Sequence, residues 1–189
     1  MFCCRHKENT DLRLFSREKA HKFKSFFREN PNYSVLSKPK ERSEEKKMSI
    51  ERVRAYFRTQ GIDSRIRELD ESSATVALAA KALGCEPCRI AKTLALIVGE
   101  TPVLVVTAGD AKIDNAKYRA LFHAKAKMLT PEETSEMIGH APGGVCPFAV
   151  NDGVKIYLDV SLKRFDEVFP ACGSGNSAIG LTIPELEKY

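Results

Sequence analysis

The chain has 189 residues, 43% of them hydrophobic, which suits one domain with a core and a short appendage. No segment has the apolar length needed to cross a bilayer, and the N-terminus lacks the features of a signal peptide, so we expect no membrane association. The net charge of +5 arises in residues 1–47, where 13 Lys and Arg face 7 Asp and Glu; residues 48–189 contain 17 against 18. Any nucleic acid is therefore expected to bind the domain at a small site.

The six cysteines lie in a chain without a secretion signal, which favours reduced thiols and a cytoplasmic location. Cys85 and Cys88 have the spacing of a metal or redox pair. A structural zinc site needs two further ligands at comparable spacing, which the sequence does not offer. We interpret the pair as incidental loop cysteines and expect neither a metal nor a cofactor.

Residues 1–47 differ in character from the rest of the chain. They carry scattered phenylalanines and a charged stretch over 37–47, with no strand pattern. We interpret 1–47 as a basic, disordered leader and 48–189 as the domain. A basic helix that binds a surface is the alternative for the leader.

From Ser49 the pattern becomes regular, with capping residues and glycines that mark where elements begin and end. Ser49 is predicted to cap the first helix and Gly61 to end it. The predicted elements that follow are a strand over 64–69, a helix over 75–83 that Gly84 ends, and a hairpin of 90–98 with 103–107. Next come a helix over 114–122 capped by Asp114 and a helix opened by the capping box Thr130–Glu133 and ended by Gly139. Strands over 154–158 and 178–181 and a last helix opened by the capping box Thr182–Glu185 complete the domain. Hairpins mixed with helices predict an α+β fold around a mixed or antiparallel sheet.

Lys92 interrupts the longest apolar run of the chain, Ile90 to Val98. In a strand, Lys92 shares a face with Ile90, Leu94 and other apolar residues, whereas a surface lysine alternates with polar ones. A lysine there either extends to water or meets an anionic or carbonyl partner, because an unpaired buried charge is costly.

Two glycine-rich loops could carry chemistry, 141–148 and 171–177. Glycines allow consecutive N–H groups to converge on one oxygen, as in an oxyanion hole, although each loop alone is also compatible with a tight turn. Neither loop has a nucleotide-binding spacing, and the sequence has no serine-hydrolase elbow or zinc-protease motif. Cys146 is a candidate nucleophile, but a small buried hydrophobe is the commoner role.

Three motifs together resemble the YbaK/EbsC family, the prolyl-tRNA synthetase-associated editing domains. They are Lys92 within Arg-Ile-Ala-Lys-Thr-Leu, the Gly-x-x-x-Pro loop Gly143–Pro147, and the late loop Gly173–Ser177, with Val105 to Asp110 between the first two. The resemblance covers 48–189. It implies a compact α+β domain with a curved mixed sheet, and hydrolysis of the ester that joins a wrong amino acid to tRNA.

The resemblance also implies roles for particular residues. By position, Lys92 matches the functional lysine of the family and Gly143 its Gly-x-x-x-Pro loop. The chemistry of ester hydrolysis adds the interpretation of Lys92 as a fixed cation and of the loop amides, with Gly144 among them, as oxyanion donors, so Lys92, Gly143 and Gly144 are the candidate catalytic residues. The resemblance implies substrate-binding positions at Pro147, Gly173, Ser174, Asn176 and Ser177. The chemistry adds Thr93 as a candidate that orients the substrate, a role that Asn176 could also have. Water or a group of the substrate would be the nucleophile.

The implied partners are the acceptor end of mischarged tRNA, of the Cys- or Ala-tRNA(Pro) type, and prolyl-tRNA synthetase. The late loop departs from the forms associated with cysteine and alanine, so the edited amino acid, the tRNA and the oligomeric state are left open. Two alternatives also stay open: a non-catalytic module that binds aminoacyl-tRNA ends or a synthetase, and a thiol or metal protein built on Cys85 and Cys88.

Overall fold

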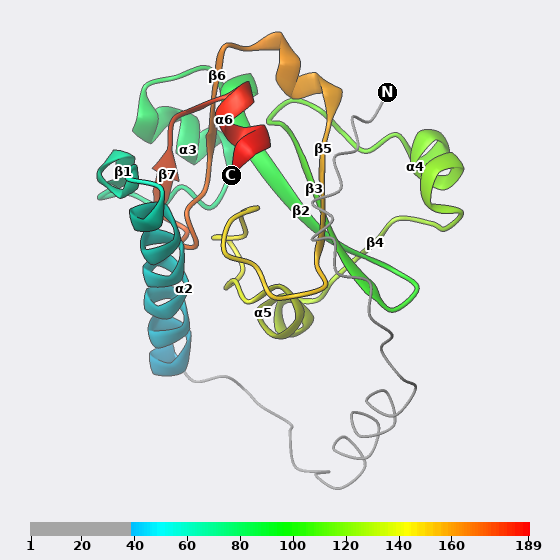
Figure 1. Cartoon of the computed structure of the whole chain (residues 1–189), viewed down its shortest axis with the longest axis horizontal. Helices are drawn as coiled ribbons and strands as arrows, with labels where there is room; N and C mark the ends of the chain where they lie inside the picture. The colour runs from blue at the N-terminus through cyan, green and yellow to red at the C-terminus, as the bar shows by residue number, and fades with distance from the viewer. Residues whose placement is uncertain (1–38) are drawn as a thin grey trace, which may run out of the picture.

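The computed structural model describes residues 39–189, which form an α+β domain around a curved sheet (Figure 1). The fold class expected from the sequence is therefore confirmed. The helices are α2 (Pro39–Thr59), α3 (Val76–Leu83), α4 (Asn115–Phe122), α5 (Pro131–Ile138) and α6 (Ile183–Lys188), with 3-10 turns η1 (Asp63–Arg65), η2 (Pro87–Arg89) and η3 (Val160–Arg164). In this part of the chain, no helix combines the length and apolarity needed to cross a membrane.

The main sheet has the strand order β5-β3-β2-β6-β8, and a short strand, β4, also pairs with β2. Its strands are β2 (Ile90–Val98), β3 (Thr101–Ala108), β4 (Lys127–Met128), β5 (Lys155–Leu158), β6 (Glu167–Pro170) and β8 (Leu181–Thr182). The β2–β3 hairpin is antiparallel, whereas β2–β6 and β3–β5 are parallel. A separate pair joins β1 (Ile66–Glu68) to β7 (Ser177–Ile179). The sheet is thus mixed, and β2 lies at its centre.

Local capping signals determine most helix ends. Thr130 and Thr182 form capping boxes with the glutamates three residues later, and Gly84 and Gly139 end their helices in the left-handed conformation. Asp114 caps α4 by accepting from two backbone N–H groups. These predicted ends are confirmed because each one satisfies backbone groups that the helix itself leaves unpaired.

The first helix differs from its prediction. Helix α2 begins at Pro39 and not at Ser49, so it extends into the segment interpreted as a leader; residues 1–38 lie outside the described residues. Proline is well suited to the first helical turn, and the Lys- and Glu-rich sequence that follows has good helix propensity. Ser49 lies within the helix and is buried, with its hydroxyl bonded to His140.

Helix α2 packs on the largest cluster of the core. Val53 and Phe57 are fully buried, and the Phe57 ring lies 4.7 Å from the Phe148 ring, centroid to centroid. Burying side chains of this size contributes about 1.5–3 kcal/mol each. This packing fixes the 141–148 loop between α2 and the sheet, with α2 on one side of the hairpin and α4 on the other (Figure 1).

Candidate functional site

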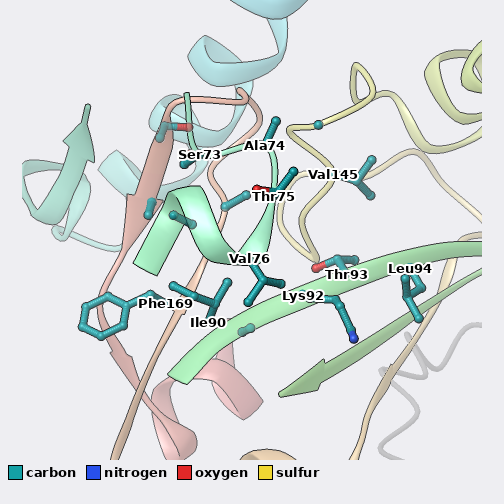
Figure 2. Close-up of a pocket in the computed structure, with 16 residues that line it drawn as sticks. Ser73, Ala74, Thr75, Val76, Ile90, Lys92, Thr93, Leu94, Val145 and Phe169 are labelled. Atoms are coloured by element: carbon teal, nitrogen blue, oxygen red, sulfur yellow. The ribbon is translucent and has the colours of Figure 1, made fainter. Parts of the chain in front are cut away.

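A cavity of about 360 Å³ opens between β2, the start of α3 and the two glycine loops (Figure 2). Most of its lining is small or apolar, and Lys92 is the one charged residue among those that line it. The lining residues are Ser73, Ala74, Thr75, Val76, Ala79, Ile90, Ala91, Lys92, Thr93, Leu94, Gly143, Val145, Phe169, Ala171, Ser177 and Ala178. A space of this size and character fits a small neutral group better than a large or charged one.

Lys92 lines the cavity, but its ammonium group is already bonded to the protein. The Nζ atom donates to the carbonyl of Gly109 at 3.3 Å and to the carbonyl of Ala111. Figure 2 shows the side chains of Lys92 and Thr93 pointing to opposite sides of β2. Burial lowers the pKa of Lys92 below its ordinary value, while the carboxylate of Asp110 acts in the opposite direction. The lysine is thus held as a fixed cation by backbone oxygens.

The turn that holds Lys92 is itself rigidly placed. A Cβ atom at Gly109 would lie 2.0 Å from the Pro87 carbonyl oxygen and 2.8 Å from Val76 Cγ1, so only glycine allows this approach. Both terminal nitrogens of Arg164 donate to the Asp110 carboxylate, one of them at 3.0 Å, and these hydrogen bonds lower the pKa of Asp110. The segment 109–111 therefore has a structural function, because it carries the two carbonyls that orient Lys92.

Thr93 points into the region between α3 and Val145 (Figure 2). Its hydroxyl oxygen is buried and has no hydrogen-bond partner among the residues of 39–189. An unsatisfied buried hydroxyl costs about 1–3 kcal/mol. A bound group that hydrogen-bonds with this oxygen would remove that cost.

The first glycine loop contributes unequally to the cavity. Gly143 lines it in the left-handed conformation, at φ +88. Gly144 is buried and does not line it; its N–H donates to the Ala141 carbonyl at 3.0 Å, so this amide is bonded within the loop, and the oxyanion role expected for it stays a prediction. A Cβ at Gly144 would lie 2.5 Å from the backbone of Gly173, which gives this glycine a packing role between the loops. Pro147 is buried outside the cavity lining.

Most polar side chains of the second glycine loop are hydrogen-bonded within the loop or to the neighbouring backbone. Of its predicted residues only Ser177 lines the cavity. Ser174 Oγ is bonded within the loop, 2.9 Å from Asn176 Oδ1 and 2.8 Å from Ser177 Oγ, and Asn176 Nδ2 donates to the Leu69 carbonyl at 3.1 Å. A Cβ at Gly173 would lie 2.6 Å from the Ser49 carbonyl oxygen, so this glycine allows the loop to approach α2. Gly173, Ser174 and Asn176 thus shape the wall, while the substrate-binding roles expected for them have no support in the cavity lining.

A buried network beneath the first loop was not found from the sequence. His140 is fully buried; its Nε2 donates to the Phe148 carbonyl at 2.8 Å, and its Nδ1 accepts from Ser49 Oγ at 2.7 Å. Burial lowers the pKa of His140, which favours the neutral ring that this pattern requires. Cys146 Sγ lies 3.5 Å from Nε2, yet burial raises the pKa of its thiol to about 12. The network therefore holds the loop and does not resemble an activated nucleophile.

The start of α3 was also missed as part of the site. Ser73 to Val76 line the cavity, and Thr75 caps α3 by accepting from the N–H of Leu78. The sequence signal was the N-cap threonine, but nothing in it indicated that this helix end faces β2. Cys85 and Cys88 lie away from the cavity lining, and no group of three His, Cys, Asp or Glu side chains suited to a metal was found in the described part of the chain.

A family model described as the aminoacyl-tRNA editing domain matches residues 70–189. The uncharacterized protein YwhH of Bacillus subtilis is 50% identical over 143 residues, which are 75% of this chain and 91% of YwhH. The proline–tRNA ligase of B. subtilis is 29% identical over 75 residues, which are 39% of this chain and 13% of that enzyme.

A solved structure gives the same result. A crystal structure described as that of a "putative trans-editing enzyme for prolyl tRNA synthetase" superposes with a TM-score of 0.67 and 32% identity, over 73% of this chain and 88% of that one. The matched regions include β2, the cavity and both glycine loops. The chain therefore belongs to the aminoacyl-tRNA editing domain family.

Proposed function

We propose that this protein is a free-standing deacylase that hydrolyses the ester between a small neutral amino acid and the 3′ end of tRNA. The observation that carries the proposal is the cavity, whose walls are small and mostly uncharged and into which the Thr93 side chain points, with Lys92 fixed on the opposite side of the same strand. Family membership supports the reaction class. Mischarged tRNA(Pro) carrying cysteine or alanine is the proposed substrate type, and the cytoplasm the proposed location.

Hydrolysis needs a nucleophile, a site for the developing negative charge and a way to exclude the wrong ester. Water adds to the ester carbonyl carbon, the C–O bond to the ribose breaks, and the ribose oxygen takes a proton derived from that water. No protein nucleophile is required, which agrees with the buried Cys146. Lys92 uses two of its three N–H donors on the Gly109 and Ala111 carbonyls, and its side chain points to the side of β2 opposite Thr93, so we propose that its charge acts on the site from across the strand and orients β2.

The chain is near neutral over 48–189, so recognition is proposed to concentrate on the acceptor end, with prolyl-tRNA synthetase as a partner that supplies further contacts. The start of α3 lies at the cavity, and unpaired N–H groups at a helix N-terminus favour anionic groups. This placement would suit the terminal phosphate.

The test is deacylation of a panel of tRNAs charged with alanine, cysteine, serine and proline. We expect at least one small non-proline ester to be hydrolysed faster than the proline ester, and Lys92→Ala to reduce that rate at least 10-fold. Lys112→Ala is the matched control, because this neighbouring lysine is exposed and does not line the cavity. Unchanged activity of Lys92→Ala on every ester would contradict the role of Lys92.

A second candidate function is supported by the same lysine. Because its ammonium bonds two carbonyls, Lys92 could serve the fold alone, and the cavity would then bind aminoacyl ends without turnover. Measurable binding of a non-hydrolysable aminoacyl-adenosine amide, with no hydrolysis of any ester in the panel, would favour this binding module.

A further inference from the structure

The edge of β2 that faces the cavity is unpaired at one residue. On this edge, pairing with β6 ends at Ala91, opposite Pro170. Pairing on the β4 side includes Leu96 with Met128, and the N–H of Leu129 reaches the Ala95 carbonyl at 3.0 Å. Thr93 lies between these two stretches.

Strand geometry determines where the peptide groups of Thr93 point. Backbone groups of successive residues alternate between the two edges of a strand, and the Ala95 carbonyl points to the β4 side. The N–H and C=O of Thr93 therefore point to that same edge, while those of Lys92 and Leu94 face β3. Both polar groups of Thr93 thus face the gap between β6 and β4.

Neither neighbouring segment fills this gap. Beyond Pro170 the chain turns away, since Ala171 pairs with Ala178. On the other side, the register that places Leu129 opposite Ala95 continues to Pro131, which has no N–H to donate. Within residues 39–189, no ladder or loop hydrogen bond satisfies the N–H or C=O of Thr93 on this edge. Because Thr93 lines the cavity, these groups are placed to meet a ligand.

An aminoacyl ester carries the complementary pair of groups. Its α-amino group is a donor and its carbonyl oxygen an acceptor, separated as they are in one residue of a strand. In an antiparallel sheet, two opposite residues exchange both N–H···O bonds. A single free strand residue therefore offers two bonds that recognise any aminoacyl group, whatever its side chain.

We propose that Thr93 binds the aminoacyl group as a one-residue β-bridge. The Thr93 carbonyl accepts from the α-ammonium group, and the Thr93 N–H donates to the ester carbonyl oxygen. This inference rests on the proposed deacylase function and deepens it. As water adds to the carbonyl carbon, negative charge gathers on that same oxygen, so the Thr93 N–H also stabilises the tetrahedral intermediate. The oxyanion donor is thereby assigned to the strand edge, since the Gly144 amide is already used.

The first experiment replaces the amide N–H of residue 93 by oxygen, through incorporation of the α-hydroxy analogue of threonine. We expect deacylation to fall about 10²–10³-fold, the effect of losing one oxyanion donor, with a melting temperature close to that of the unmodified protein. The same change at Leu96 is the control, because its N–H faces β3 opposite Val103. The Leu96 analogue should lose stability and keep its activity well below its melting temperature. Full activity of the residue 93 analogue would overturn the proposal.

The second experiment tests the bridge without turnover. A non-hydrolysable alanyl-adenosine amide is added to the ¹⁵N-labelled protein, and the backbone amide signals are followed. We expect a large shift of the Thr93 signal and a smaller one at Leu96; an unmoved Thr93 signal in a complex that binds would overturn the bridge. Acetylation of the α-amino group of the ester substrate should reduce hydrolysis at least 10-fold, and equal rates would remove the contact to the Thr93 carbonyl.

The two proposals fail separately. If the protein hydrolyses no ester but the Thr93 signal shifts with the amide analogue, the deacylase function fails and the bridge stands. If hydrolysis is seen and the residue 93 analogue is fully active, the bridge fails and the deacylase function stands.

Discussion

Replacing Gly144 by alanine should separate the two glycine loops that form the cavity wall. The added Cβ would lie 2.5 Å from the carbonyl carbon and oxygen of Gly173 and 2.6 Å from Ser174 Cα. All three are backbone atoms, so a side-chain rotation cannot relieve the contact. An ordinary contact begins at 3.4 Å, and the loops must therefore move apart by about 1 Å.

Such overpacking of a buried site costs about 1–3 kcal/mol. For a domain of this size, each kcal/mol lowers the melting temperature by roughly 2–4 °C, so Gly144→Ala should melt about 2–12 °C below the unchanged protein. Because the loops also carry Gly143 and Ser177, which line the cavity, we expect ester hydrolysis to fall as well.

Gly175→Ala is the matched control within the second loop. Its Cβ would meet Ala74 Cβ at 3.5 Å, an ordinary contact, and Gly175 does not have a positive φ. Thermal unfolding followed by circular dichroism compares the two variants. The reasoning is refuted if Gly144→Ala melts within 1 °C of the unchanged protein, or if Gly175→Ala is equally destabilised.

Three further predictions concern other residues. The hydrogen bond from Arg65 lowers the pKa of Glu185 to about 2, below its unfolded value of 4.5, so this pair stabilises the fold above pH 4.5 and its contribution disappears as the pH falls towards 2. Glu185→Gln should therefore lose about 1–2 kcal/mol at pH 7 and nothing near pH 2, as measured by urea unfolding; an equal loss at both pH values would contradict the linkage. Cys146→Ala should keep at least half of the deacylation rate, because its thiol stays protonated, whereas a loss of more than 100-fold would revive Cys146 as a nucleophile. Thr93→Val keeps the shape and the backbone but lacks the hydroxyl, so it should lower the ratio of seryl to alanyl ester hydrolysis several-fold. Thr93→Ser keeps the hydroxyl and should preserve this ratio. Equal ratios in both variants would show that the Thr93 hydroxyl does not contact the side chain of the bound amino acid.

Helix ends could be predicted wherever residues close in sequence supply the hydrogen bonds or the backbone conformation that the end of the helix needs. The capping boxes at Thr130 and Thr182 and the glycine at Gly139 required no knowledge of the rest of the fold. Ser49 misled because it is a good N-cap in isolation. In the folded protein the Ser49 hydroxyl is bonded to His140, ninety-one positions later in the chain, and Ser49 lies in the middle of the helix and not at its start.

The parallel strand β6 was not predicted. Its four residues, Glu167–Pro170, are too few for a periodic signal, and they form a strand because a distant segment, β2, offers its edge. The interruption on this edge of β2 was equally hidden, because a gap in a sheet depends on which segments arrive beside it and where each one turns away.

Within the site, the sequence located the loops better than the individual roles. Glycine is needed both where a ligand approaches and where two backbones touch, and only the fold distinguishes Gly143 at the cavity from Gly144 between the loops. Similarly, Asn176 is exposed and polar, yet its amide is bonded to the Leu69 carbonyl. The catalytic role of Lys92 and the ligand-binding role of Thr93 stay predictions that the experiments above test.

The single-residue gap in the sheet also has a consequence for solubility. A free strand edge can recruit a strand from another chain and so seed aggregation, and proteins protect such edges by covering or shortening them. Here the free length is one residue, bounded by β6 on one side and by Pro131 on the other, with Val145 beside it in the cavity wall. A gap of one residue offers a single N–H and a single C=O, which matches one amino acid and not a strand of several residues. The same narrowness that protects the fold from other proteins would then select a ligand one residue long.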